Sequence, residues 1–444
     1  MSKFKLVAPF MIIMLVLTAC PAGESGDGES GAPEGSAGAP ADLEEGDGTI
    51  EVTSLWGGQE ATAFEAMLAD FTESSGITVE YTSQRQDYAT VLNNRIAQND
   101  APDVAIIPGI GFLRSFAGDD LLVPLSDLGI DASAIEDNYA SGILDVGTVN
   151  DELVALMVKL NSKATVWYKP ATFEENGYEV PATFEDMVAL TDQMKADGLT
   201  PWAVGALDSW TLTDWFEILY LTMHGEEAYD TLFSSEGNWT DQTVLDTAEA
   251  MTQIINEDNV AGGIEGALAT AFVDGIGQVF SENADAELYY EGGFVGGIAK
   301  GDVNPDLVPG EDIDFFDFPQ SDGLKVTIGG DVMAAFNADS DVAEFMQYMT
   351  TPEAGTAWAE GGTIISPIKG VDTSVYEEVS PLAVKEAEQV TSADVVRFDG
   401  ADLLPAGTDL GAKLQTVIQT PDDAASAFEQ FLSEVDAAWA EEEG

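Results

Sequence analysis

The alternation of apolar and polar residues at the start of the folded region predicts a regular succession of strands and helices. Residues 49–56 alternate as a β-strand does, and two glycines follow them. Apolar residues then recur at helical spacing over 64–71, and a second alternating stretch covers 77–81. Another helical stripe covers 88–96, and the short apolar run at 103–107 is typical of a buried parallel strand. The order is βαβαβ, which predicts an α/β fold that begins as a doubly wound sheet.

The loops after the first and third predicted strands are candidate ligand-binding positions. In doubly wound sheets, ligands lie beyond the carboxyl ends of the strands. Trp56, Gln59 and Glu60 follow the first strand, and Pro108 and Gly109 follow the third. We therefore expect these residues at a binding edge, although Trp56 is equally compatible with packing in the core.

Three later helices are predicted from signals at their ends. Thr183 precedes Asp186 by three residues, which is the spacing of a capping box. Thr351-Pro352 combines an N-cap residue with a first-turn proline. A third helical pattern begins after Pro421, and its last residues, 441–444, are expected to fray.

The first 48 residues have the pattern of a targeting segment followed by a tether. After two lysines, residues 6–17 are almost wholly apolar, which suits a signal peptide and is too short to span a bilayer comfortably. We predict a signal peptide over 1–19, and the residues before Cys20 resemble a bacterial lipobox, in which the cysteine thiol is lipidated. A plain signal peptide with an incidental Cys20 is the alternative. Residues 20–48 are Gly, Ala, Ser, Pro and acids, which predicts a disordered acidic tether.

The charge of the chain narrows its possible partners. Among 444 residues, 81 are Asp or Glu and only 15 are Lys or Arg, so the formal net charge is −66. Nucleic acid and anionic membrane surfaces would be repelled, which argues against both as partners. Strong self-repulsion destabilises a compact state at low salt, so we predict a halophilic protein that works in saline surroundings. An acidic surface that only aids solubility is the alternative.

The scarcity of cysteine and histidine excludes several kinds of chemistry. Cys20 is the single cysteine, so neither an intramolecular disulfide nor a thiolate-rich metal site can form. His224 is the single histidine, so a zinc site built on several histidines is excluded, and any Ser-His-Asp triad would have to use this residue. We interpret His224 as the end of a helix. No P-loop or EF-hand pattern occurs, and we predict neither a cofactor nor a metal site.

A series of short motifs runs through the rest of the chain. The motifs are Ala101-Pro102-Asp103-Val104, Leu160-Asn161-Ser162-Lys163, Trp167-Tyr168-Lys169-Pro170, Pro181-Ala182-Thr183-Phe184, Glu291-Gly292-Gly293-Phe294, Gly329-Gly330-Asp331 and Thr351-Pro352-Glu353-Ala354-Gly355. In this order, and behind a lipobox, they resemble the family 1 extracellular solute-binding proteins. This is the maltose-binding-protein-like group, and the resemblance is strongest to its alpha-glucoside-binding members. It covers roughly residues 49–440.

The resemblance implies a class II periplasmic-binding-protein-like fold, with two α/β lobes joined by a hinge and a ligand cleft between them. Lobe 1 would comprise 49–159 plus 325–372, and lobe 2 would comprise 160–324 plus 373–444. Closure of the lobes over the ligand would create the surface that a membrane permease recognises. The family's usual Tyr-Asn is Tyr168-Lys169 here, which leaves the contacts of this hinge region open.

One segment has the composition of a sugar site. Sugars present hydroxyls around an apolar ring face, so their sites combine carboxylates with flat aromatic rings. Between Pro201 and Trp215, three tryptophans alternate with two acids; the candidate residues are Trp202, Asp208, Trp210, Asp214 and Trp215. Trp202 and Trp215 are also compatible with the core, and we favour Trp210 and Trp215 as ligand contacts.

The other candidate ligand residues are single charged residues and positions beside glycines. They are Arg85, Lys159, Glu291, Gly293, Phe294, Gly330 and Asp331. Glycine lets the backbone approach a ligand closely. For Arg85 and Lys159 the alternative is a structural ion pair, and for the glycine-rich positions it is an ordinary turn.

The function predicted from these features is capture of a carbohydrate outside the membrane, for example an oligosaccharide such as an alpha-glucoside, and its delivery to the permease subunits of an ABC importer. The protein would be a monomer, anchored to the cell membrane through Cys20, and would not be an enzyme. Two alternatives stay open. A lipid-anchored glycoside hydrolase needs only two suitably spaced carboxylates, and a binder of a polyamine could use the same aromatic and acidic side chains.

Overall fold

The computed structural model describes residues 43–84, 86–107, 109–139, 143–362, 364–371 and 374–442. These residues belong to a single compact unit that spans Gly38–Gly444. The predicted signal peptide, the lipidation site Cys20 and most of the tether lie outside the described residues. Within the described ranges, no helix combines the length and the apolar character that crossing a bilayer requires.

The larger of the two main sheets, here called sheet I, has six strands. They are β1 (Thr49–Ser54), β2 (Thr78–Ser83), β3 (Val104–Ile107), β6 (Ala155–Ser162), β11 (Lys325–Ala335) and β12 (Val395–Phe398). The strand order is β12-β11-β3-β1-β2, and β6 also pairs with β11. β1 is parallel to both β2 and β3, and helices α1 (Gly58–Ser75) and α2 (Tyr88–Ala97) connect them, so the predicted βαβαβ start is confirmed.

The smaller main sheet, sheet II, has four strands in the order β10-β7-β9-β8. They are β7 (Thr165–Tyr168), β8 (Trp202–Ala203), β9 (Leu288–Glu291) and β10 (Asp314–Asp317). The register places Phe315, Trp167 and Tyr289 side by side, and they belong to a small hydrophobic core on one face of the sheet. Because side chains alternate along a strand, their neighbours Phe316, Val166 and Tyr290 face the larger core on the other side.

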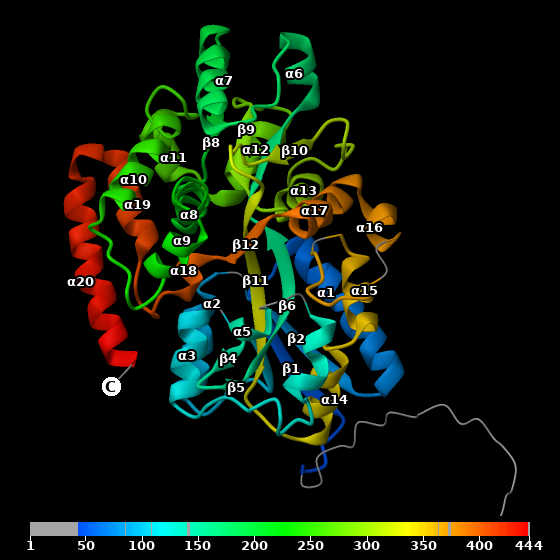
Figure 1. Cartoon of the computed structure of the whole chain (residues 1–444). Helices are drawn as coiled ribbons and strands as arrows, with labels where there is room; N and C mark the ends of the chain where they lie inside the picture. Colours follow the sequence, from blue (N-terminus) through cyan, green and yellow to red (C-terminus); the bar gives the residue numbers. More distant parts are fainter. Residues whose placement is uncertain are drawn as a thin grey trace, which may run out of the picture. The chain divides into compact units, whose positions relative to one another are not determined.

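The remaining elements surround these sheets (Figure 1). A two-stranded ribbon consists of β4 (Thr148–Val149) and β5 (Glu152–Leu153). The helices before sheet II are α3 (Ile110–Gly118), α4 (Ala132–Ile135), η1 (Glu136–Asn138) and α5 (Ile143–Val146). Those from β7 to β11 are α6 (Pro170–Asn176), α7 (Phe184–Ala196), α8 (Trp210–His224), α9 (Glu226–Leu232), α10 (Gln242–Ile254), α11 (Gly263–Ala269), α12 (Phe272–Phe280), α13 (Phe294–Ile298) and η2 (Ala299–Val303). Those after β11 are α14 (Ser340–Tyr348), α15 (Pro352–Ala359), α16 (Ser374–Val379), α17 (Pro381–Ser392), α18 (Gly400–Leu403), α19 (Leu410–Gln419), η3 (Pro421–Asp423) and α20 (Ala424–Glu442).

The chain passes between the two sheets close to the first two predicted crossings. It leaves sheet I after β6 and enters sheet II at β7, and it returns between β10 and β11. The third predicted crossing falls at Asp372 and Thr373, which are outside the described residues. β12 lies within the segment assigned to lobe 2, yet it pairs in parallel with β11 in sheet I.

The predicted helix starts are found at the expected residues. Thr183 and Asp186 form a complete capping box at the start of α7, with each side chain bonded to the other residue's backbone N–H. Thr351 caps α15 through the N–H of Ala354, and Pro352 is its first residue. These ends depend on neighbours three residues away, which explains why sequence alone located them.

Replacing Thr183 by alanine is expected to lower the free energy of unfolding by about 1 kcal/mol, because the Asp186 N–H loses its hydrogen-bond acceptor. Urea denaturation measures this difference. Thr231→Ala, an exposed change within α9, is the control and should alter stability by less than about 0.5 kcal/mol. Equal effects of the two substitutions would contradict the capping role.

The prediction that residues 441–444 are frayed is wrong for residues 441 and 442. α20 continues to Glu442, and the Glu442 carboxylate accepts a hydrogen bond of 2.8 Å from Arg114 Nε on α3. The Arg114 guanidinium also lies 4.9 Å from the centre of the Trp439 ring. A partner from a distant part of the chain therefore holds the helix end that sequence alone suggested to be free.

Candidate functional site

A cavity of about 390 Å³ lies where the carboxyl ends of β1 and β3 approach α8 and the segment that follows β12. Its lining residues are Leu55, Ile107, Gly109, Ile110, Lys163, Ser209, Trp210, Thr213, Gly330, Asp331, Val332, Asp399, Ala401, Asp402, Leu404, Thr408, Asp409, Leu410 and Gly411. The position at two strand ends agrees with the rule for doubly wound sheets. We call this cavity the cleft pocket.

A larger cavity of about 610 Å³ lies elsewhere, against α7, α10 and the end of α8. Phe184, Met223 and Gln253 are among its lining residues, and none of the predicted ligand residues is. It also touches no strand end of sheet I. We therefore place the candidate site in the cleft pocket despite its smaller volume.

Four of the predicted residues form one network of hydrogen bonds and ion pairs at the edge of the cleft pocket. The indole N–H of Trp56 donates to Asp331 Oδ2 at 2.8 Å, and Lys159 Nζ lies 3.6 Å from the same oxygen. Lys159 also donates to Glu60. Trp56 is 2% exposed and packs against Phe64 in the core. Its place is therefore beneath the pocket surface, where it orients the Asp331 carboxylate.

Trp210 is the one tryptophan of the segment 201–215 that lines the cleft pocket. It is the first residue of α8, and 38% of it is exposed. Its ring packs against Phe272 with 5.0 Å between ring centres and against Phe294 at 6.2 Å. Lys163 Nζ lies 5.6 Å from the ring centre. The predicted residue Phe294 thus supports Trp210.

The other members of this segment lie behind the surface. Trp202 is fully buried and donates its indole N–H to Thr191 Oγ1 at 2.9 Å. Trp215 is 1% exposed and packs between Trp202 and Tyr290. Asp208 accepts the N–H of Phe272 at 2.7 Å, which satisfies a free donor at the start of α12. These three predictions therefore coincide with structural roles, and we do not include the residues in the site proposed below.

The predicted glycines near strands occupy positions of close backbone approach. Gly330 lines the cleft pocket, and a Cβ there would lie 2.6 Å from the Lys159 carbonyl oxygen of the paired strand. Gly109 also lines the pocket, with φ of 145°, which only glycine adopts easily. Gln59 is exposed at the start of α1 and lies against Gly301. The predicted residues Arg85 and Pro108 are outside the described residues.

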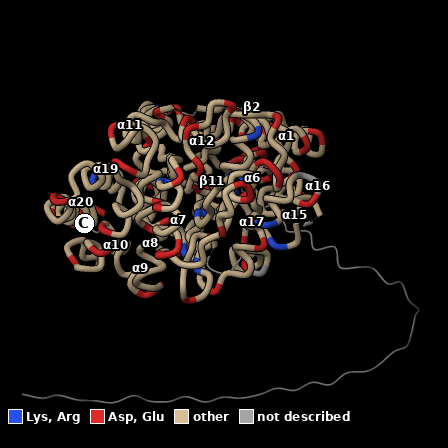
Figure 2. Tube along the Cα trace, turned by 90° about the horizontal axis from the view of Figure 1, so that it is seen from above, with Lys and Arg blue, Asp and Glu red and all other residues tan. Residues whose placement is uncertain are grey.

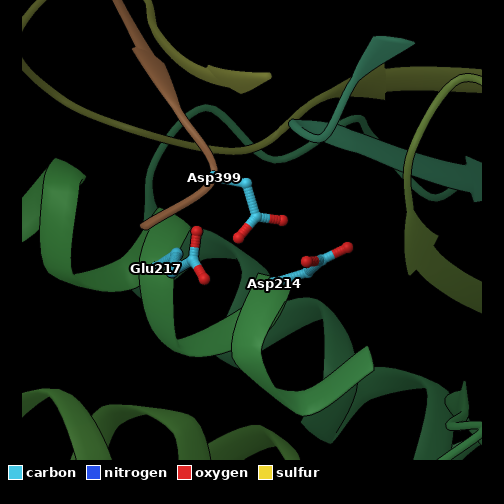
Figure 3. Close-up of side chains that lie close together, drawn as sticks. All are labelled: Asp214, Glu217 and Asp399. Atoms are coloured by element: carbon cyan, nitrogen blue, oxygen red, sulfur yellow. The ribbon is translucent and has the colours of Figure 1, made fainter. Parts of the chain in front are cut away.

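Beneath the pocket, Lys163 joins two buried carboxylates that come from distant parts of the chain. Its Nζ donates to Asp214 Oδ1 at 2.9 Å and also to Asp399 Oδ2. Asp214 is 1% exposed and Asp399 is 3% exposed. Figure 3 shows Asp214 and Glu217 on α8, with Asp399 reaching over from the segment after β12. Tyr290 donates its hydroxyl to the backbone oxygens of both Lys163 and Asp214.

Burial and neighbouring charges shift the pKa values of this cluster in different directions. Burial raises the pKa of Asp214 to about 6, although the Lys163 ammonium offsets part of the effect. Burial also acts to raise the pKa of Asp399, but Lys163 outweighs it, and the pKa stays below its usual value. The pKa of Glu217 and that of Glu291 are well above the usual range, first through burial and then through nearby carboxylates. Among the described residues, Asp214 Oδ2 and Glu291 Oε2 are buried without a hydrogen-bond partner. The raised pKa of Glu291 favours its protonated form, which can donate a hydrogen bond to the neighbouring Asp214.

The carboxylates of Asp214, Glu217 and Asp399 have atoms within 4.8 Å of one another, a spacing that a metal ion could use. Two observations argue that the protein uses a side-chain cation there. The Lys163 ammonium already bridges Asp214 and Asp399. Glu217 is occupied by the backbone N–H groups of Gly400 and Ala401, at 2.7 and 3.0 Å. Each of the three carboxylates is thus already bonded to at least one protein group.

Several pocket residues were missed by the sequence reasoning. They are Lys163, Ser209, Thr213, Asp399, Asp402, Thr408 and Asp409. Most belong to the segment after β12, which carries no aromatic residue between 399 and 411 and no motif that marked it. Glu217, which belongs to the buried cluster beneath the pocket, was also not predicted. The sequence did contain a signal for it, because Glu217 and Asp214 are the only acids of the otherwise largely apolar helix α8.

The glycines beside Glu291 serve packing. A Cβ on Gly293 would lie 1.8 Å from the Glu386 carboxyl carbon, so this predicted residue leaves room for a buried acid on α17. Glu386 in turn accepts the Ser162 N–H at 2.9 Å, at the end of β6. Glu291 itself is 1% exposed and lies behind Asp214 rather than on the pocket surface.

Glu386→Gln is expected to remove a pH dependence of stability. Burial raises the pKa of Glu386 to about 7, whereas an unfolded glutamate titrates near 4.3. Between these values the folded protein binds the proton more tightly, so the free energy of unfolding falls as pH rises, by up to about 3 kcal/mol at ~1.4 kcal/mol per pKa unit. Urea denaturation from pH 4.5 to 7.5 measures it. In Glu386→Gln the free energy of unfolding should lack this decrease with pH. Glu388→Gln, an exposed change on the same helix, should retain it.

Comparison with known proteins supports a common origin along the whole chain. The osmoprotective compounds-binding protein GgtB of Synechocystis sp. is 29% identical over 445 residues, which covers 98% of this chain and 99% of the relative. The alpha-glucosides-binding periplasmic protein AglE of Rhizobium meliloti is 31% identical over 386 residues, with 82% and 81% coverage.

The maltose-bound MalE3 of T. maritima has the same fold, with a TM-score of 0.68 at 16% identity, and covers 87% of this chain and 98% of its own. This confirms the predicted periplasmic-binding-protein-like α/β fold. The family model for bacterial extracellular solute-binding proteins matches residues 57–356. The chain therefore belongs to the bacterial extracellular solute-binding proteins, a family that binds solutes and does not catalyse reactions.

Proposed function

We propose that the chain is the carbohydrate-binding component of an ABC importer and that its ligand lies in the cleft pocket beside Trp210. The observation that carries the proposal is the position of this ring, because a partly exposed tryptophan in a pocket is a costly arrangement without a ligand. Its exposed face suits the apolar face of a sugar ring. Lys163 and the pocket acids supply polar partners for the hydroxyls.

The size and the lining of the pocket support a small saccharide. Its volume of about 390 Å³ lies at the lower end of the range of roughly 300–1,000 Å³ for small-molecule sites. Asp331, Asp402 and Asp409 can each accept hydrogen bonds from hydroxyl groups. The names of the two relatives point the same way, since one binds alpha-glucosides and the other osmoprotective compounds. We propose an alpha-glucoside, or a related osmoprotective glycoside, as the ligand.

We further propose that the ligand acts by favouring a closed arrangement of the two predicted lobes. The pocket has residues from both, with Gly109 and Asp331 on one side and Trp210 and Asp409 on the other. The first turn of α3 lies directly against the segment after β12, since a Cβ on Gly111 would be 2.5 Å from the Leu404 carbonyl oxygen. A ligand that touches both sides has higher affinity for the closed state and therefore selects it.

The proposal places the protein outside the cytoplasmic membrane, tethered through a lipid on Cys20. Its support is the pattern of residues 1–48, with an apolar run, a lipobox-like sequence and an acidic linker. Labelling of the full-length protein with a radioactive fatty acid tests it. Label that persists in a Cys20→Ala variant would overturn the assignment.

The acidic composition motivates the proposal that the protein needs salt. Figure 2 shows acidic residues along nearly every part of the trace and few basic ones. Repulsion among them weakens the folded state, and salt screens it. We expect the urea midpoint to be higher at 1 M than at 10 mM NaCl. Equal urea midpoints at the two salt concentrations would contradict the proposal that the protein needs salt.

A thermal-shift screen of residues 43–444 in 1 M NaCl tests the central proposal. The panel contains maltose, trehalose, sucrose, glucosylglycerol, polyamines and amino acids. A ligand that binds the folded state raises the melting temperature by mass action. We expect shifts with one or more glucosides. Shifts in melting temperature with amines alone would overturn the assignment of a sugar as ligand. If no compound shifts the melting temperature, the proposal of a carbohydrate-binding protein is overturned.

A further inference from the structure

The surface of the cleft pocket has an unequal balance of charges. The side chains of Asp331, Asp399, Asp402 and Asp409 line it, and among its described lining residues Lys163 is the one cation. Burial, and then the nearby Asp399, raise the pKa of Asp402 well above its usual value, so the negative charge of the lining comes mainly from the other three aspartates. An unequal lining matters because field lines concentrate in a partly enclosed cleft between low-dielectric walls. Such a lining disfavours an anionic ligand unless the Lys163 charge is available to it.

The contacts of Lys163 indicate that its charge is already matched. The ammonium lies 2.9 Å from Asp214 and is also bonded to Asp399, and both carboxylates are buried. The pKa of Asp399 is held below its usual value by this ammonium despite burial, so Asp399 keeps its negative charge. Lys163 therefore contributes a hydrogen-bond donor to the pocket but no surplus of positive charge.

The negative charges of Asp331 and Asp409 are less well compensated by nearby cations. Asp331 shares Lys159 with Glu60, so one ammonium serves two carboxylates there. In the part of the chain that the structure describes, neither Asp402 nor Asp409 pairs with a lysine or an arginine. Asp409 is exposed at the rim, and Asp402 is half buried close to Gly109.

We propose that the cleft pocket selects its ligand by charge, accepting an uncharged polyhydroxy compound and rejecting anionic analogues that carry a phosphate or a carboxylate. Asp214 and Asp399 determine this specificity, because they neutralise the Lys163 ammonium and leave no positive charge for an anionic ligand. The inference rests on the proposed function and adds the class of ligand. Carboxylates accept hydrogen bonds from hydroxyl groups well, whereas an added anion would face like charges at short range.

Isothermal titration with a matched pair of sugars tests the inference. The probes are the glucoside with the largest thermal shift and its 6-phosphate, for example trehalose and trehalose 6-phosphate, in 0.1 and 1 M NaCl. We expect the phosphate to bind at least ~100-fold more weakly, and the difference to shrink with salt, which screens exposed charges. Equal binding of the two sugars would overturn the inference and leave the proposed function standing.

Asp399→Asn is the decisive variant. It frees part of the Lys163 charge, while asparagine can still accept the Asp402 N–H at the start of α18. We expect the ratio of the affinities for the neutral sugar and its 6-phosphate to fall at least ~10-fold. Asp409→Asn removes a charge at the exposed rim and should reduce the ratio of neutral-sugar to sugar-phosphate affinity by a smaller factor. It tests the inference if Asp399→Asn folds poorly. Asp322→Asn removes one exposed charge beside the larger cavity and is the matched control.

The control separates the pocket from the general field of the protein. If Asp322→Asn narrows the preference as much as Asp399→Asn does, long-range repulsion explains the selectivity and the inference is overturned. Failure of both sugars to bind would remove the proposed function and the inference with it. An amino sugar that binds while the neutral sugar does not would also overturn the inference, since the ligand would then be cationic.

Discussion

Replacing Lys163 by methionine is expected to lower the free energy of unfolding by about 3–5 kcal/mol, the cost typical of breaking a buried ion pair. The substitution keeps most of the side-chain volume but leaves Asp214 and Asp399 buried without a counter-charge. Without the ammonium, the pKa of Asp399 should rise, and the variant should lose more stability at pH 8 than at pH 5. Urea denaturation at the two pH values, in constant 1 M NaCl, measures both effects.

Lys413→Met is the control for this prediction. Lys413 pairs with Glu434 at 2.7 Å, and the Glu434 side chain is 47% exposed, so the change should cost less than about 1 kcal/mol. Adding Asp214→Asn and Asp399→Asn to Lys163→Met should recover part of the loss, because neutral amides need no counter-charge. Equal losses for Lys163→Met and Lys413→Met would contradict the structural role of the buried cluster.

Replacing Trp210 by alanine is expected to weaken ligand binding about 30-fold, or about 2 kcal/mol, with a smaller effect on stability. The ring is held by Phe272 and Phe294 on its buried side, and its remaining surface faces the pocket. Its loss therefore removes a preformed apolar surface for the ligand. Titration calorimetry with the glucoside found in the screen measures the affinity.

Met223→Ala is the matched control for Trp210. Met223 lies near the other end of the same helix and is 43% exposed, but it lines the larger cavity. It should leave the affinity within about twofold of the unaltered protein. Unchanged binding by Trp210→Ala, or a comparable loss with Met223→Ala, would show that the ligand does not lie in the cleft pocket.

The elements that sequence predicted well are those defined by neighbouring residues. The βαβαβ start follows from apolar residues repeating every second or every third to fourth position, and the start of α7 follows from Thr183 and Asp186. The fold could be predicted because its motifs occur in a family order along the chain. The end of α20 could not, because its partner Arg114 is more than three hundred residues away.

The candidate site was predicted only in part, for a physical reason that the tryptophans illustrate. Trp202, Trp210 and Trp215 have the same side chain and occur within one short segment. Which of them faces a pocket depends on what packs on each side of β8 and α8, and only Trp210 has an open side. Composition can indicate that aromatic rings are present, but the packing of other elements decides which ring is exposed.

Sequence by itself determined the strand and helix periodicities, the helix starts, the acidic character and the family of the chain, since each of these depends on local spacing or on the order of motifs. Only the tertiary structure decided which charges meet. Lys163, Asp214 and Asp399 come from the link after β6, from α8 and from the end of β12, and no local rule connects them. Burial then makes their pairing strong, because low polarity around a charge raises the cost of leaving it alone.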